Sequence, residues 1–201
     1  MRPYLLAGVM ILALLLASTV QARNASGPDF PKTQQTMEVL AFSEDGKLFA
    51  VKTLDEEGRR SFQVRSSRKG EIEDVVSFFE DDESKSWKRV KRKHKLKADP
   101  SDSGENEKLG ITLVTAQKGK KLHIYVMKGE KVKRYGSVDL LATPDGKTAA
   151  TSSVKQLIWC PKGKHVVMVY SQKMKKPHKW ESDSVHAFKF KRYKANFDDA
   201  D

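Results

Sequence analysis

The sequence carries one short phrase twice, as Ala41–Val51 (AFSEDGKLFAV) and as Trp159–Val169 (WCPKGKHVVMV). In each phrase an apolar run leads into a polar segment that ends in Gly-Lys, and a second apolar run follows. Asp or Pro starts a tight turn, Gly adopts backbone angles that other residues resist, and Lys continues on the exposed side. Each phrase therefore predicts two antiparallel strands joined by a tight turn.

Similar short runs fill most of the chain outside one charged segment. Between residues 37 and 79 the runs MEVLAF, LFAVKTL, SFQVRSS and IEDVVSFF are separated by Gly-bearing turns, which is typical of a four-stranded meander. Comparable runs return from residue 109 to about residue 190, and no long helical periodicity occurs beyond the N-terminus. We expect an all-β protein, with two blade-like antiparallel meanders packed as a small sandwich, an open barrel or a partial propeller.

The turn phrases resemble a known repeat. Phe42–Lys47 (FSEDGK), with its counterparts Trp159–Lys164 (WCPKGK) and Ala142–Lys147 (ATPDGK), resembles the F-S-P-D-G-K repeat of TolB-like and related WD40-like β-propellers. The resemblance covers two units, roughly Met37–Phe79 and Val154–Phe190, and implies blade-like sheets. In such propellers the phrase is structural, so it implies no catalytic or ligand residue here. The chain has room for four blades at most, so we favour the smaller domain.

The N-terminus has the features of a secretory signal. Residues 1–22 begin with Arg2, continue in an apolar run and end in small residues, with Val20 and Ala22 at the positions that signal peptidase reads. The apolar run is shorter than the ~20 residues of a spanning helix, which disfavours the alternative of a membrane anchor. We therefore expect an exported protein, periplasmic or secreted, without a transmembrane span after cleavage. Asn24 begins a glycosylation sequon that is used only in a eukaryotic source.

The whole sequence divides into consecutive parts. The predicted parts are a signal peptide (1–22), a flexible lead-in (23–36), one β domain (37–195) with a charged insertion (80–108), and an acidic tail (196–201).

Composition limits both covalent chemistry and partners. The sole cysteine, Cys160, excludes an intramolecular disulfide and lies in the apolar run LIWCP, so we interpret it as a small buried hydrophobe rather than a reactive thiol. The formal net charge of +12 favours anionic partners: a polymer of the cell envelope, a lipid surface or an acidic protein. Export makes nucleic acid an unexpected partner.

Known catalytic patterns are absent from the sequence, which has no G-x-S-x-G elbow, H-E-x-x-H helix, Walker loop or G-x-G-x-x-G. The five histidines are scattered, and we interpret His123 and His165 as strand residues, with a two-histidine metal site across neighbouring strands as the alternative. Glu80–Glu83 is interpreted as a solvated acidic patch. We predict no catalytic, cofactor-binding or metal-binding residue, and no cofactor.

The candidate site is the basic run Lys85–Lys97 (KSWKRVKRKHKLK). Dense cations around a tryptophan suit a phosphate- or sulfate-bearing polymer, or a lipid interface. The predicted polyanion-binding residues are Lys85, Trp87, Lys88, Arg89, Lys91, Arg92, Lys93, Lys95 and Lys97. The pattern leaves Ser86–Leu96 open between an extended strand and a short helix, and Asp99–Lys108 reads as a loop. In the alternative interpretation, Lys keeps an edge strand or loop soluble while Trp87 and Val90 pack inward.

These observations lead to one functional hypothesis and two alternatives. The leading hypothesis is a non-enzymatic, exported binding or structural module of the cell envelope that contacts an anionic partner through the basic run. The first alternative is a propeller-like scaffold that recognises another protein through its sheet edges or a Trp180–Ser184 loop. The second is a hydrolase whose site is assembled from scattered His, Asp and Ser residues.

Overall fold

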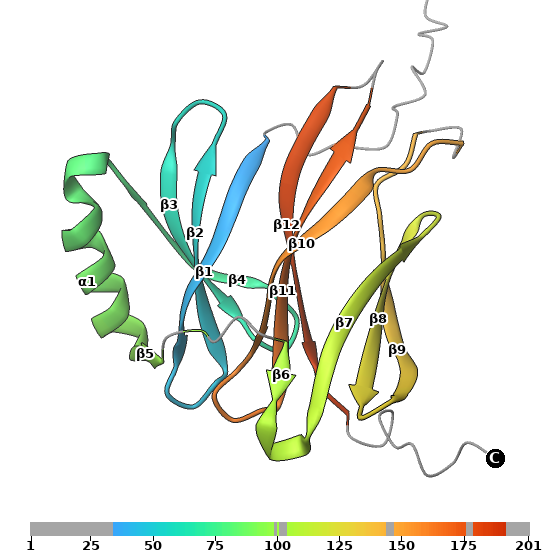
Figure 1. Cartoon of the computed structure of the whole chain (residues 1–201). Coiled ribbons are helices and arrows are strands. Elements are labelled where there is room, and N and C mark those ends of the chain that lie inside the picture. Colours follow the sequence, from blue (N-terminus) through green and yellow to red (C-terminus); the bar gives the residue numbers. More distant parts are fainter. Residues whose placement is uncertain (1–33, 99, 101–103, 144–146, 176–178, 192–201) are drawn as a thin grey trace, which may run out of the picture.

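The computed structural model describes residues 34–98, 100, 104–143, 147–175 and 179–191. Antiparallel β-sheets make up most of these residues, which confirms the predicted all-β class. A helix and three sheets lie side by side as four layers (Figure 1). The predicted signal peptide (1–22) and acidic tail (196–201) lie outside the described residues, and so does the lead-in up to residue 33. The described chain is already a strand from Gln35, two residues before the predicted start.

The first sheet contains the predicted N-terminal meander, with strand order β4-β3-β2-β1-β5. The four runs expected from the sequence all form strands, and a short fifth strand from the charged insertion joins the β1 edge. The strands are β1 (Gln35–Ser43), β2 (Leu48–Asp55), β3 (Arg60–Ser66), β4 (Ile72–Phe78) and β5 (Leu96–Ala98).

Two further sheets come from the second half of the chain. The central sheet has the order β10-β11-β12, with β10 (Thr151–Trp159), β11 (His165–Met174) and β12 (Trp180–Lys189). The outer sheet has the order β6-β7-β8-β9, with β6 (Glu105–Asn106), β7 (Ile111–Lys118), β8 (Lys121–Lys128) and β9 (Lys131–Asp139). A 3₁₀ turn, η2 (Glu107–Leu109), lies between β6 and β7.

Two segments that were predicted to be loops form strands. The described part of the 99–108 segment forms β6 and most of η2, because Gly104 accepts the Leu113 N–H (2.9 Å) and donates to the Leu157 carbonyl (2.9 Å). Trp180–Ser184 is the first half of β12, paired with β11 throughout. The β12 pairing is a local hairpin, with Met174 opposite Trp180. The contact of Gly104 with Leu157 joins residues far apart in the sequence, so local turn chemistry did not reveal it.

The central sheet is buried on both faces, which explains the continuous apolar run of β11. Val166, Met168 and Tyr170 face the outer sheet in one hydrophobic cluster. Val167 and Val169 face the first sheet in a second cluster. A strand with solvent on one face alternates apolar and polar residues, whereas a strand between two layers is apolar throughout.

The two repeated phrases pack against each other. Phe42 and Phe49, from the strands flanking the first turn, share a hydrophobic cluster with Cys160, which begins the second turn. Each turn closes with a hydrogen bond from its glycine: Gly46 N–H to the Ser43 carbonyl and Gly163 N–H to the Cys160 carbonyl, both 2.8 Å. Both glycines have positive φ, as the phrase predicted.

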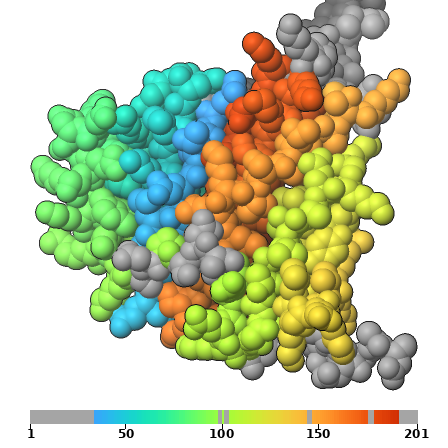
Figure 2. Space-filling view, viewed as in Figure 1, coloured from blue at the N-terminus to red at the C-terminus, as the bar shows by residue number. Residues whose placement is uncertain are grey.

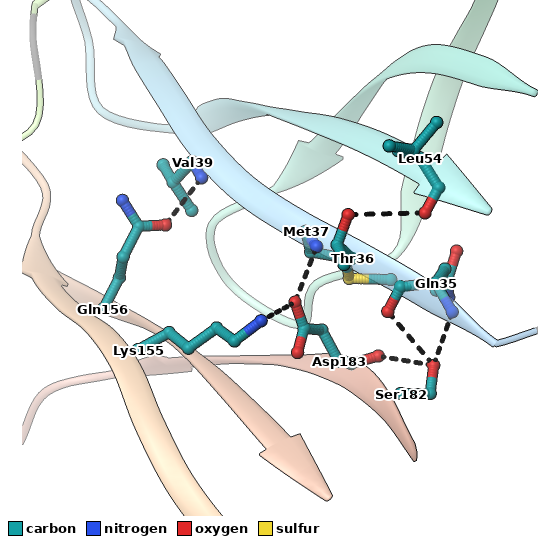
Figure 3. Close-up of polar contacts among 9 residues, drawn as sticks. All are labelled: Gln35, Thr36, Met37, Val39, Leu54, Lys155, Gln156, Ser182 and Asp183. Atoms are coloured by element: carbon teal, nitrogen blue, oxygen red, sulfur yellow. Dashed lines mark hydrogen bonds and ion pairs between the residues drawn. The ribbon is translucent and has the colours of Figure 1, made fainter. Parts of the chain in front are cut away.

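Side chains of the central sheet cover the part of the β1 edge that β5 does not reach. Every second residue along this edge donates its backbone N–H to a side-chain oxygen: Gln35 to Ser182 Oγ (3.0 Å), Met37 to Asp183 Oδ2 (2.8 Å) and Val39 to Gln156 Oε1 (2.8 Å) (Figure 3). Lys155 Nζ also lies 2.8 Å from Asp183 Oδ2. Because an unpaired buried N–H is costly, these three acceptors hold the first sheet in register with the central sheet.

The charged insertion forms a helix that covers the outer face of the first sheet. A 3₁₀ turn, η1 (Glu80–Asp82), leads into α1 (Glu83–His94). The helical alternative for residues 86–96 is therefore correct as far as His94, and Leu96 already begins β5. Acidic residues precede the first turn and basic residues fill the last, which favours the helix dipole at both ends. Lys95 ends the helix in the left-handed conformation, with φ 51°.

Candidate basic groove

The nine predicted residues lie on α1 or directly after it, and their side chains point in different directions. Trp87 points toward the sheet, with its ring 5.0 Å from that of Phe62, and Phe62 in turn stacks on Phe78 at 4.3 Å. Val90, one turn later, is buried in the same cluster. The Lys91 ammonium lies 5.8 Å from the centre of the Trp87 ring as a cation–π pair. Trp87 and Val90 therefore pack inward, as the alternative interpretation proposed, but from a helix rather than from an edge strand or loop.

Three further residues of the predicted set, Lys93, Lys95 and Lys97, have local structural roles. Lys93 Nζ (2.9 Å) and His94 Nε2 (2.7 Å) both contact Asp74 Oδ2 on β4, which ties the last turn of α1 to the sheet. These hydrogen bonds, the one from Lys93 first, lower the pKa of Asp74 to about 2. Lys97 pairs with Glu44 (3.2 Å), and the backbone of Lys95 forms the helix C-cap.

The remaining four predicted cations form one stripe, which we call the basic face: Lys85, Lys88, Arg89 and Arg92. Their spacing of three, four and seven residues places them on one side of an α-helix. All four are solvent-exposed, and no ion pair joins any of them to another residue in the described parts of the chain. The space-filling view shows α1, in green, at the left-hand end of the molecule, away from the other two sheets (Figure 2).

The basic face forms one wall of a groove of about 1320 Å³. The β2–β3 turn, the end of β4 and η1 form the rest. Two of the groove's acids are already paired, Glu57 with Arg59 and Glu80 with Arg60, each at 2.8 Å. Asp82, at the start of α1, is the third acid among the described residues that line it. The four cations of the basic face therefore dominate the charge that the groove offers to a ligand.

Sequence reasoning missed the exposed aromatic residue of this groove. Phe79 follows β4 directly and its side chain is 80% exposed, whereas the preceding Phe78 is 9% exposed and packs in the core. The run IEDVVSFF was interpreted as one strand, although the acidic residues that follow it signal that the strand ends. β4 ends at Phe78, and this end separates the two rings: Phe78 lies in the core and Phe79 lies in solvent.

The described lining of the groove contains several cations and the rings of Phe78 and Phe79, without an arrangement of catalytic groups. Histidine is not among the described residues that line it. A smaller cleft of about 310 Å³ between β1 and the central sheet brings together Ser171, Ser182 and Asp183, again with no histidine among its described lining. Here Asp183 and Ser182 hold the β1 edge, so the polar cluster already has a structural role.

The two histidines interpreted as strand residues lie on different sheets. His123 lies on β8 in the outer sheet and His165 on β11 in the central sheet, so the two are not on neighbouring strands. Within the described ranges, no group of three or more His, Cys, Asp or Glu side chains is placed to hold a metal ion. Burial lowers the pKa of both histidines, which favours the neutral ring.

Cys160 is buried, as predicted. Its side chain is 2% exposed, and its Sγ accepts the His165 N–H at 3.3 Å within the second repeated turn. It packs with residues of the first sheet and acts there as a small apolar side chain.

Comparisons with protein families, with curated proteins and with solved structures find no match to this chain. The resemblance of the turn phrases to propeller repeats stays a prediction. Across the part of the chain that the structure describes, no helix has the length and apolar character needed to cross a membrane.

Proposed function

We propose that this protein is an exported, non-enzymatic binding module of the cell envelope, and that it holds a phosphate- or sulfate-bearing polymer on the basic face of α1. The observation that carries the proposal is the single stripe of Lys85, Lys88, Arg89 and Arg92 along a groove, without ion-pair partners among the described residues. Cations that merely keep a surface soluble are dispersed or paired with acids, as Lys93 and Lys97 are here.

The geometry suits a polymer better than a single small ion. Four cations spaced over about two turns of helix extend for roughly 10 Å, at a rise of about 1.5 Å per residue, so they contact several anionic groups in a row. The groove is open and about 1320 Å³ in volume, which gives room for a chain to lie along it. Binding by counterion release would make the affinity strongly dependent on salt.

Retention on immobilised heparin, a sulfated polymer, tests the proposal. The variant combines Lys85→Gln, Lys88→Gln, Arg89→Gln and Arg92→Gln, because glutamine keeps the helix propensity and removes the charge. We expect elution at lower salt, and a slope of log affinity against log salt that is smaller by up to about four.

The matched control removes the same charge from the outer sheet, with Lys118→Gln, Lys120→Gln, Lys128→Gln and Lys131→Gln, all at exposed positions. Its retention should fall much less than that of the α1 variant. Equal losses in the two variants would mean that only net charge matters, and an unchanged α1 variant would show that the basic face does not bind the polymer. Thermal unfolding of both variants checks that the fold is kept.

A further inference from the structure

Phe79 is held in place by its backbone while its ring remains in solvent. The residue lies between β4 and η1, and its carbonyl accepts the Asp82 N–H at 3.1 Å. The neighbouring Phe78 is fixed in the core, where its ring stacks on Phe62 at 4.3 Å. With 80% of its surface exposed, Phe79 is the most exposed large hydrophobic residue among those that the structure describes.

The ring and the basic face belong to the same surface. Phe79 lines the groove together with Lys85, Lys88, Arg89 and Arg92. The acid that follows it, Glu80, is paired with Arg60, which reduces the negative charge beside the ring. A polymer recognised only through its sulfate or phosphate groups would leave the ring in water. A partner with both anionic groups and an apolar layer would use the whole surface.

We propose that this surface also binds an anionic lipid bilayer, an inference that rests on the basic face assigned in the function proposed above. The four cations of the basic face contact headgroup phosphates, and Phe79 enters the interface between headgroups and acyl chains. Cations attract an anionic leaflet and a buried apolar ring adds its transfer free energy, so the two contributions act together. Trp87, the residue that the sequence suggested for this role, is held against Phe62 instead.

The test measures co-sedimentation of the full chain with vesicles of phosphatidylglycerol and phosphatidylcholine, and with vesicles of phosphatidylcholine alone. We expect binding to the anionic vesicles only. Phe79→Ser should weaken that binding on the order of tenfold. The four-glutamine variant of α1 should weaken it by about fivefold for each cation that contacts the surface.

Controls separate this inference from the proposed function. Val132→Ser removes another exposed apolar side chain, 56% exposed on β9, and should leave vesicle binding unchanged. Heparin has no apolar layer, so Phe79→Ser should elute from it at the salt concentration of the wild type. Because Phe79 is exposed, its replacement should also leave the thermal midpoint unchanged.

Each other outcome has a defined meaning. Equal binding of the wild type and Phe79→Ser to anionic vesicles overturns the inference, and so does equal binding to both kinds of vesicle. Retention on heparin without binding to any vesicle overturns the lipid surface while the proposed polymer binding stands. Loss of neither ligand in the four-glutamine variant overturns both proposals.

Discussion

The α-carbon of Gly46 faces the thiol of Cys160 where the two repeated turns meet: a methyl group on Gly46 would lie 3.3 Å from the Cys160 Sγ and 3.6 Å from its Cβ. Gly46 also has φ 69°, in the left-handed region that side chains disfavour. Glycine is therefore needed at position 46 for two reasons. It permits the backbone conformation of the first turn, and it leaves room for the second repeated turn to pack against it.

Gly46→Ala should therefore destabilise the protein through both backbone strain and packing. Gly119→Ala is the matched control, since Gly119 has a similar φ of 59° but no atom within 4 Å of the added carbon. We expect a loss of about 1–2 kcal/mol for Gly119→Ala from strain alone. The loss for Gly46→Ala should be larger by about 1 kcal/mol or more. Urea unfolding measures both, and equal losses would show that the contact between the turns contributes nothing.

The burial of Cys160 predicts a slow thiol. With 2% of its surface exposed, the native protein should react with a thiol-specific reagent many times more slowly than the protein unfolded in guanidinium. Absorbance of the released chromophore gives both rates. A native rate close to the unfolded rate would indicate an accessible, reactive cysteine and contradict its structural role.

Asp183 should stabilise the folded protein because it accepts the Met37 N–H at the β1 edge. The residue is 3% exposed, and its replacement by alanine leaves the Met37 N–H without that acceptor. We expect Asp183→Ala to cost about 1–3 kcal/mol in the free energy of unfolding. Asp183→Asn keeps an amide oxygen in this place and should cost less.

The neighbouring Glu181 provides the comparison for Asp183. It pairs with Lys173 at 2.8 Å in an exposed position, and Glu181→Ala should change stability by no more than about 1 kcal/mol. If the alanine variants at 181 and 183 were equally stable, the edge contacts of Asp183 would not hold the two sheets together.

The contact of Asp74 with the last turn of α1 predicts a dependence on acid. Its pKa in the folded protein is about 2, below the ordinary range near 4, because Lys93 and His94 hydrogen-bond to the carboxylate. A lowered pKa stabilises the fold fully above about pH 4, and this contribution is lost as the pH falls toward 2. We expect Asp74→Asn to be less stable than the wild type at neutral pH, with a difference that shrinks in this window.

Urea unfolding at several pH values measures that difference. Glu71→Gln is the control, because Glu71 is exposed and forms an ion pair with Lys69 across the β3–β4 turn, at 3.3 Å. Its effect should stay within about 0.5 kcal/mol. A difference between wild type and Asp74→Asn that is constant from pH 7 to pH 2 would contradict the assigned role of the charge.

Much of the fold could be predicted because it depends on local chemistry. Gly46 and Gly163 mark turns by their position in a Gly-Lys phrase, and the apolar runs beside them form strands. For the candidate site, only the basic composition of the segment could be predicted. Lys85–Lys97 is basic in any conformation, but its division into anchoring, paired and free cations requires the helix and the sheet below it.

By itself, the sequence determined the all-β class, the turns, the burial of Cys160 and the segment that carries the charge. These depend on backbone preferences and on hydrophobicity, which neighbouring residues set. Only the tertiary structure decided that the charged segment is a helix. Trp87 and Val90 are too few to indicate a helical face in the sequence, and the helix is held because both pack against Phe62 and Phe78 of the first sheet. The tertiary structure also decided that Phe79 points outward, because the place where β4 ends depends on its pairing with β3.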